Sequence, residues 1–152
     1  MKKDPYADGK FAVNPYFKKS DVTGALVVVL DGRMNNRGLE LIIPISRCVV
    51  KDVVHELILT DEEEASPGEQ VNRIAYLGFI TLENSGVLVQ GDEVHMNGRM
   101  IGHLAGFDET HMPNHLNLVI RTGHLFTGAE LNAEPGMKIT FHLPAKERRE
   151  TQ

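Results

Sequence analysis

The stretch that decides the fold is GVLVQGDEVHMNGRMIGHLAGF, residues 86–107. At its centre lies Asn97-Gly98, a pair that favours a two-residue type I′ turn because both turn positions need a positive φ. Short segments with β-strand character flank the pair, so the stretch predicts a β-hairpin. The register that follows from this turn pairs Met96 with Arg99, Val94 with Ile101, Asp92 with His103 and, on the opposite face, His95 with Met100.

Further segments of the same kind precede and follow the hairpin. They are GALVVVL (24–30), LELIIPISRCVV (39–50), VVHELIL (53–59), YLGFITL (76–82), HLNLVIR (115–121) and MKITFHL (137–143). So many short strands separated by turn residues predict an all-β fold, a small barrel of six to eight mostly antiparallel strands. We expect an irregular N-terminal arm over residues 1–20, a single barrel domain over 21–145 and a C-terminal tail over 146–152.

At most one short helix is expected in this barrel. Ser66 as the N-cap, Pro67 at the first helical position and Glu69 three residues after the cap form a capping-box signature. The signature predicts a helix over Pro67–Ile74.

Charge and composition exclude several classes of protein. The 152 residues carry 16 Lys and Arg against 21 Asp and Glu, a formal charge of -5, which argues against binding to nucleic acid. The longest apolar runs, 25–30 and 41–45, are far shorter than the roughly 20 residues that span a bilayer. With a single cysteine, Cys48, and no signal-like N-terminus, the chain is expected to be cytoplasmic.

The candidate site is the segment HLAGFDETHMPNH, residues 103–115, with three histidines, an Asp and a Glu. It follows the hairpin and precedes an alternating strand, so we interpret it as a loop between strands at the barrel rim. If this loop binds a divalent transition metal through imidazole groups, the ligands are His103, His111 and His115. Pro113 disfavours a zincin-like helix between the last two. The wider ligand-binding set comprises Arg99, His103, Asp108, Glu109, His111, Asn114 and His115.

No other motif names a reaction. The chain has no Gly-x-Ser-x-Gly elbow, no GxGxxG stretch and no P-loop, and Cys48 lies in an apolar segment typical of a buried, inert thiol. Whether the protein is an enzyme is therefore open. The expected partner is a small molecule or a protein, and exposed strand edges are compatible with a homodimer.

The C-terminal half resembles the glucitol/sorbitol-specific IIA component of the bacterial sugar phosphotransferase system. The resemblance covers about sixty residues and rests on a pattern of turn residues and their neighbours. They are Gly86, Leu88, Gly91 and Asp92, then Asn97-Gly98, Ala105-Gly106, and Asn114 with Leu116. It implies a small closed barrel that carries a phosphoryl group on a histidine in the strand before Gly86. Here that segment, YLGFITLENS, contains no histidine, so the resemblance implies the fold without the phosphocarrier residue.

Three functions remain open from the sequence. The first is a binding or regulatory protein of the IIA-like barrel type. The second is a metal-binding protein or metal-dependent enzyme that uses the loop 103–115. The third is a phosphocarrier in which one of the loop histidines replaces the missing one.

Overall fold

The structure, a computed structural model, describes residues 15–145, and every helix or strand in this range is a β-strand. The strands are β1 (Val22–Met34), β2 (Leu39–Glu40), β3 (Ser46–Val49), β4 (Val54–Thr60), β5 (Gln70–Val71), β6 (Ile74–Leu82), β7 (Gly86–Val89), β8 (Glu93–Met96), β9 (Arg99–Asp108), β10 (Asn117–Arg121) and β11 (Lys138–His142). The described range accordingly holds no helix that could cross a membrane.

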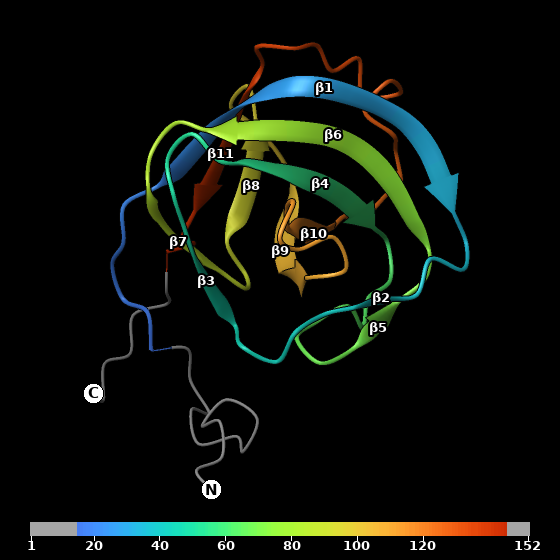
Figure 1. Ribbon diagram of the computed structural model, residues 1–152, viewed down its shortest axis with the longest axis horizontal. Coiled ribbons are helices and arrows are strands. Elements are labelled where there is room, and N and C mark those ends of the chain that lie inside the picture. Colours follow the sequence, from blue (N-terminus) through green and yellow to red (C-terminus); the bar gives the residue numbers. More distant parts are fainter. Residues whose placement is uncertain (1–14, 146–152) are drawn as a thin grey trace, which may run out of the picture.

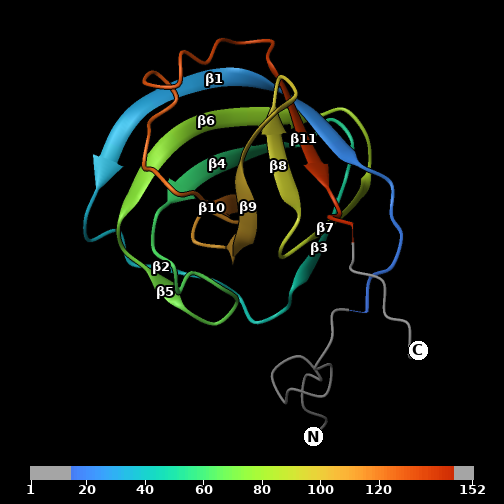
Figure 2. The ribbon, with the colours of Figure 1, turned by 180° about the vertical axis from the view of Figure 1, so that it is seen from behind.

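Seven of these strands close into a barrel in the order β1-β11-β8-β9-β10-β4-β6. Both ribbon views show β1, β6 and β4 curving along one wall, with β8, β9 and β10 opposite them (Figures 1 and 2). Neighbouring strands are antiparallel except β4 and β10, which run parallel. The expected all-β barrel of mostly antiparallel strands is confirmed.

The barrel interior is an apolar core, which we call the inner core. Strand alternation supplies it, because every second residue of a strand faces inward. Its fully buried members include Leu57 and Leu59 of β4, Leu118 and Ile120 of β10, and Phe141 of β11. Burying each of these side chains stabilises the fold by roughly 1.5–3 kcal/mol.

A second apolar cluster, the outer cluster, lies on the outside of the barrel wall. Residues 35–45 and 61–72, which carry the paired strands β2 and β5, form a covering segment over β4, β9 and β10. Leu39 and Val71 of this segment are fully buried in the same cluster as Ile58 of β4. Since Ile58 alternates with Leu57 and Leu59 along β4, this strand is buried on both faces, which explains the continuous apolar run Leu57–Leu59.

Two glycines allow the curved strands to approach each other closely. A Cβ at Gly78 of β6 would lie 2.1 Å from the carbonyl oxygen of Val28, and one at Gly102 of β9 would lie 2.3 Å from that of Arg121. Both neighbours are backbone atoms, which cannot move aside as a side chain can. The tight wall between β1 and β6 therefore depends on Gly78.

Residues 15–21 precede β1 without regular structure, and a buried ion pair fastens them to the barrel. The ammonium group of Lys19 lies 3.0 Å from a carboxylate oxygen of Asp92, which also accepts a hydrogen bond from the amide of Val89. Burial raises the pKa of Asp92, although the Val89 amide and Lys19 favour its charged form. The remainder of the expected arm, residues 1–14, and the expected tail, 146–152, lie outside the described residues.

The helix expected over Pro67–Ile74 is wrong: this segment holds a turn, β5 and the start of β6. Gly68 has φ +89°, outside the helical range, and its amide donates to the carbonyl of Leu41. The Leu41 amide in turn donates to the Glu69 carbonyl, so backbone pairing with β2 outcompetes the helix. The hydroxyl of Ser66 donates to the carbonyl of Glu64.

The expected hairpin register holds only next to the turn. Met96 pairs with Arg99 and His95 with Met100, as the Asn97-Gly98 turn predicts. Beyond them a β-bulge shifts the register by one residue, so Val94 faces Gly102 and His103 faces Glu93. The predicted pairs of Val94 with Ile101 and of Asp92 with His103 are therefore wrong. The bulge turns Gly102, which has no side chain, toward the crowded neighbouring strand.

Replacing Gly78 with Ala should destabilise the barrel, because the new methyl group would collide with the Val28 carbonyl. We expect the free energy of unfolding, measured by urea denaturation, to fall by about 1–3 kcal/mol, the range for overpacked sites. Gly123→Ala is the matched control, since a Cβ there has no atom within 4 Å. Equal stability of the two variants would contradict the close-approach argument.

Candidate metal centre

Three potential metal ligands converge on the outside of the barrel. They are Glu56 of β4 and His111 and His115 of the loop between β9 and β10, with one ligand atom from each lying within 4.8 Å of the others. Glu56 and His115 are buried, with 6% and 9% of their surface exposed, whereas His111 is exposed. We call this set the Glu56 cluster.

Strand alternation turns Glu56 outward, next to the covering segment. Its neighbour Leu57 belongs to the inner core and Ile58 to the outer cluster, so Glu56 shares the outer face with Ile58. Across the sheet Glu56 faces Phe79 of β6 on one side and Asn117 of β10 on the other. A carboxylate is thus placed at the edge of an apolar cluster, where an ionised group needs a partner.

A tight turn brings the two histidines together. The amide of Asn114 donates to the carbonyl of His111 at 2.9 Å, and that of His115 approaches the same oxygen at 3.4 Å. The turn contains the cis peptide bond Met112-Pro113, and the segment is not helical, as Pro113 predicts. The imidazole centroids of His111 and His115 lie 5.0 Å apart.

Each ring nitrogen of His115 has a polar neighbour. Nε2 lies 3.2 Å from a carboxylate oxygen of Glu56, and Nδ1 lies 2.8 Å from the side-chain amide of Asn114. The ring edge of Phe79 packs against it at 5.2 Å between centroids. These contacts fix the orientation of the imidazole, which is what a metal-binding histidine requires.

A guanidinium group borders the exposed side of the cluster. Arg37, from the covering segment, places Nη2 3.3 Å from Nε2 of His111. The covering segment, β4 and the loop between β9 and β10 therefore all reach the same site.

Asp108, one of the residues expected to bind ligand, anchors the loop. Its carboxylate accepts hydrogen bonds from the amides of Thr110 and Glu40, both at 2.9 Å, and from the side chain of Asn117 at 3.0 Å. Burial opposes the charge, but hydrogen bonds from Thr110, Glu40 and Asn117 together lower the pKa of Asp108. The carboxylate thereby ties the end of β9 to the covering segment and to β10.

An acceptor without a hydrogen bond lies beside Glu56. The side-chain oxygen of Asn117 is buried and has no partner among the described residues. Leaving such an atom unpaired costs about 1–3 kcal/mol, and in proteins it usually marks a water molecule or an ion. Asn117 lies opposite Glu56 in the β4–β10 pair, so a polar species that satisfies this oxygen would lie next to the cluster.

His55, the neighbour of Glu56, is buried and neutral at physiological pH. Its Nδ1 accepts a hydrogen bond from the amide of Leu116 at 3.0 Å. Burial lowers the pKa of His55 to about 4, with smaller contributions from His115 and Arg47. By accepting this hydrogen bond, the neutral His55 ring therefore holds the end of the loop in position.

Three other expected site residues, His103, Arg99 and Glu109, do not belong to the Glu56 cluster. His103 lines a depression of about 410 Å³ together with Asp61 and Arg121. Its imidazole is not part of the Glu56 cluster. Arg99 lines the barrel mouth, and Glu109 forms an ion pair with Arg47. The expectation of a buried thiol is wrong: Cys48 lies in β3 and is exposed.

Glu56 is the residue that the sequence analysis missed. Its signal was present: in VVHELIL, Glu56 and the neighbouring His55 interrupt a strand that is otherwise apolar. A charge in such a position calls for a specific partner.

Comparison with known proteins gives a family but no function. Residues 16–142 match the profile of a family of unknown function (DUF6917). No curated protein and no solved structure matches significantly.

Replacing Asp108 with Asn should loosen the loop, because an NH₂ group would then face the donors that Asp108 now binds. We expect a loss of about 2 kcal/mol in unfolding free energy at pH 7. Since the pKa of Asp108 is lowered in the folded state from 3.8, its charge stabilises the fold above that pH, and the benefit disappears as the pH falls through the folded value.

The difference between wild type and Asp108→Asn, measured by urea denaturation across pH 2–7, should therefore shrink in acid. Asp21→Asn serves as the control, because Asp21 is exposed and paired with His142 at the surface. A pH-independent difference would show that the charge of Asp108 contributes nothing.

Proposed function

Because the chain belongs to DUF6917, a family of unknown function, its activity has to be sought in its own residues, and we propose that it binds one divalent transition-metal ion through Glu56, His111 and His115. Two imidazoles and a carboxylate suit zinc, and the same set binds iron(II) in oxygenases.

The distance between Glu56 and His115 is the observation that carries the proposal. Two ligand atoms about 2.1 Å from one ion lie about 3.0 Å apart in octahedral geometry and about 3.4 Å apart in tetrahedral geometry. The carboxylate oxygen of Glu56 and Nε2 of His115 are separated by 3.2 Å, within this interval. An ion that replaces the proton of the hydrogen bond between Glu56 and His115 would thus leave the positions of both side chains nearly unchanged.

His111 completes the set from the exposed side. Ligands of one ion are about 4.2 Å apart in trans and about 3.4 Å apart in tetrahedral geometry, so a spread of up to 4.8 Å requires a shift of at most roughly 0.6 to 1.4 Å. His111 is exposed and lies on a loop, which makes such a shift easy. Three protein ligands leave at least one coordination position for water or substrate, the arrangement of catalytic rather than structural zinc sites.

Metal binding is favoured over the phosphocarrier role for a reason of charge. A phosphoryl group on Nε2 of His115 would add negative charge next to the carboxylate of Glu56. A cation at the same place would be attracted by it. The kinship with the sorbitol-specific IIA component remains a prediction. The regulatory role and the cytoplasmic location also remain predictions.

Isothermal titration of tag-free protein with zinc, nickel or manganese salts tests the proposal. We expect one ion per chain, and at least about 100-fold weaker binding after Glu56→Gln or His115→Gln, since loss of a direct ligand should exceed the 10–100-fold effect of an outer contact. Glu93→Gln is the matched control: Glu93 lies 3.0 Å from His95 in a similar pair, and no third potential ligand within residues 15–145 joins this pair. No stoichiometric binding, or an equal effect of Glu93→Gln, would overturn the proposal.

Asn114 should strengthen the site without binding the ion. When Nε2 of His115 is a ligand, its Nδ1 carries a proton and needs an acceptor, which the side-chain oxygen of Asn114 provides after the amide turns over. Asn114→Ala is expected to weaken metal binding about tenfold, and Asn114→Asp, which keeps an acceptor, to preserve it. Equal affinities of the alanine variant and wild type, measured by the same titration, would exclude this role.

A further inference from the structure

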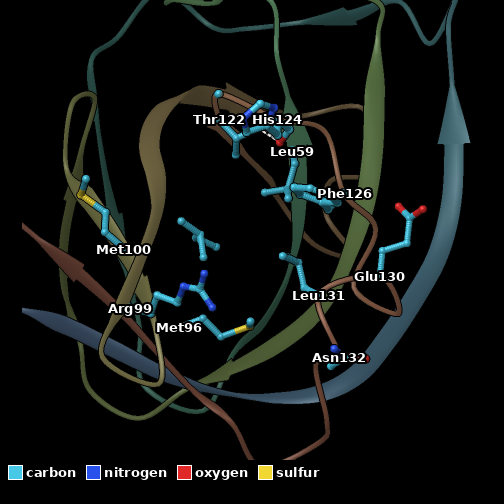
Figure 3. A pocket seen from close by; sticks show the side chains of 12 residues that line it. Leu59, Met96, Arg99, Met100, Thr122, His124, Phe126, Glu130, Leu131 and Asn132 are labelled. Carbon is cyan, nitrogen blue, oxygen red and sulfur yellow. Dashed lines mark hydrogen bonds between the residues drawn. The ribbon is translucent and has the colours of Figure 1, made fainter.

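A cavity of about 450 Å³ opens at one end of the barrel, and we call it the mouth cavity (Figure 3). It lies between the β8–β9 hairpin and residues 122–132. Its lining comprises Leu59, Met96, Arg99, Met100, Ile101, Thr122, Gly123, His124, Phe126, Glu130, Leu131 and Asn132. None of these residues belongs to the Glu56 cluster.

Apolar side chains form the floor and part of the wall of the mouth cavity. Leu59 is a fully buried member of the inner core, and Met96, Ile101 and Leu131 pack against that core while remaining partly exposed. Phe126, with 42% of its surface exposed, stands at the rim. The cavity thus continues the barrel core outward and can desolvate the apolar part of a ligand.

Arg99, an exposed residue at the start of β9, brings a positive charge to the mouth cavity. It pairs across the hairpin with Met96, which packs against the inner core, whereas Arg99 itself is exposed. Figure 3 shows the guanidinium group turned toward the centre of the cavity. Arg99 has no ion pair or side-chain hydrogen bond with any residue in 15–145.

The carboxylate in the lining, that of Glu130, is already engaged. It forms an ion pair with Arg33 and accepts a hydrogen bond from the amide of Thr127, which lowers the pKa of Glu130. In Figure 3 it points away from Arg99. The free charge of the lining is therefore positive.

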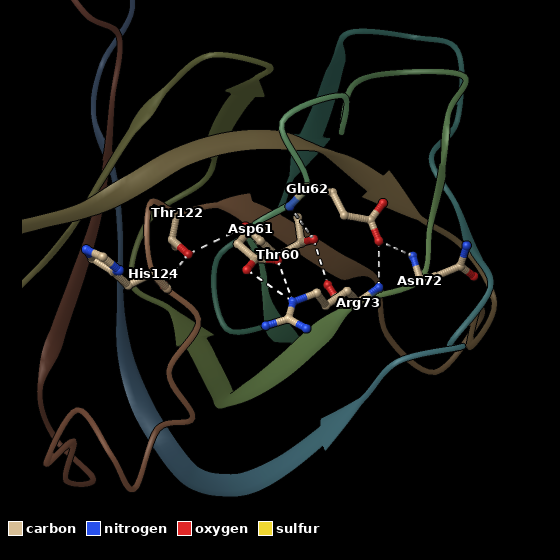
Figure 4. A network of polar contacts seen from close by, with 7 residues as sticks. All are labelled: Thr60, Asp61, Glu62, Asn72, Arg73, Thr122 and His124. Carbon is tan, nitrogen blue, oxygen red and sulfur yellow. Dashed lines mark hydrogen bonds and ion pairs between the residues drawn. The ribbon is translucent and has the colours of Figure 1, made fainter.

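A polar network fixes the segment that forms one side of the mouth (Figure 4). The amide of Thr122 donates to the Thr60 carbonyl at 2.8 Å, and its hydroxyl donates to the His124 carbonyl at 2.6 Å. The Thr60 hydroxyl donates to the carbonyl of Arg73, whose guanidinium binds Asp61. The side of the cavity is thus held in place before a ligand arrives, which lowers the entropic cost of binding.

From this combination we propose that the mouth cavity binds a small organic anion with an apolar body, namely a free monocarboxylate of medium chain length. The carboxylate pairs with Arg99, which can bind it through two parallel hydrogen bonds, and the hydrocarbon chain lies along Met96, Ile101 and Leu131. The volume of about 450 Å³ falls within the range of small-molecule sites. This binding is independent of a metal at the Glu56 cluster.

Titration with octanoate, followed by calorimetry or by amide chemical shifts, tests the inference. We expect saturable binding of octanoate, at least tenfold weaker binding of 1-octanol, and amide shifts concentrated at the lining residues. Arg99→Gln should weaken octanoate binding at least tenfold, and Arg99→Lys less, because lysine keeps the charge but loses the two-pronged geometry. Arg47→Gln, which removes a guanidinium that is paired with Glu109, should leave the affinity unchanged.

Several results would overturn the inference: no saturable binding of octanoate, equal affinity for 1-octanol, or equal affinities of Arg99→Gln and Arg47→Gln. Pretreatment with EDTA separates this site from the metal centre. Octanoate binding should persist after EDTA and in Glu56→Gln, and its loss in either case would show that the anion binds a metal ion instead.

Discussion

The parallel pairing of β4 with β10 is the constraint on which both the barrel and the candidate site depend. Parallel strands cannot be joined by a tight turn, so the chain has to travel from the end of β4 through the covering segment, β6 and the hairpin before it returns as β10. The same pairing sets Glu56 opposite Asn117, one residue after Leu116, whose carbonyl accepts the Glu56 amide. The loop that carries the histidines is thus held beside the carboxylate by backbone hydrogen bonds.

The covering segment gives β4 an environment that a simple barrel would not provide. Its apolar side chains convert the outer face of β4, β9 and β10 into a second core, so Glu56 is buried although it points away from the barrel interior. Arg37 and the Glu40 amide extend this contact to His111 and Asp108. The Glu56 cluster therefore lies at a seam between two layers, a common place for binding sites because side chains from distant segments meet there.

Local patterns predicted most of the strands, and they failed where long-range contacts decide the structure. Alternation and the Asn97-Gly98 turn were sufficient for the hairpin, because both depend on neighbouring residues. The bulge near Ile101 was not predictable in this way, because it depends on how closely Gly102 approaches β10 and the residues after it. The helix predicted from the Ser66-Pro67 signature likewise does not form, because the backbone of this segment pairs with β2 instead. For the site, the loop and two of its histidines could be predicted, but Glu56 could not be joined to them without knowing that β4 lies beside β10.

The pairing of β1 with β11 has a consequence for the synthesis of the protein. β1 lies between β6 and β11, so the first strand of the barrel keeps one unpaired edge until the last strand is available. During translation β1 can pair with β6 soon after the ribosome releases it, but the edge that binds β11 stays open while the following sixty residues are made. Closure of the ring therefore has to wait for β11, and a nascent chain that stalls before Lys138 exposes a strand edge that is free to pair with another chain.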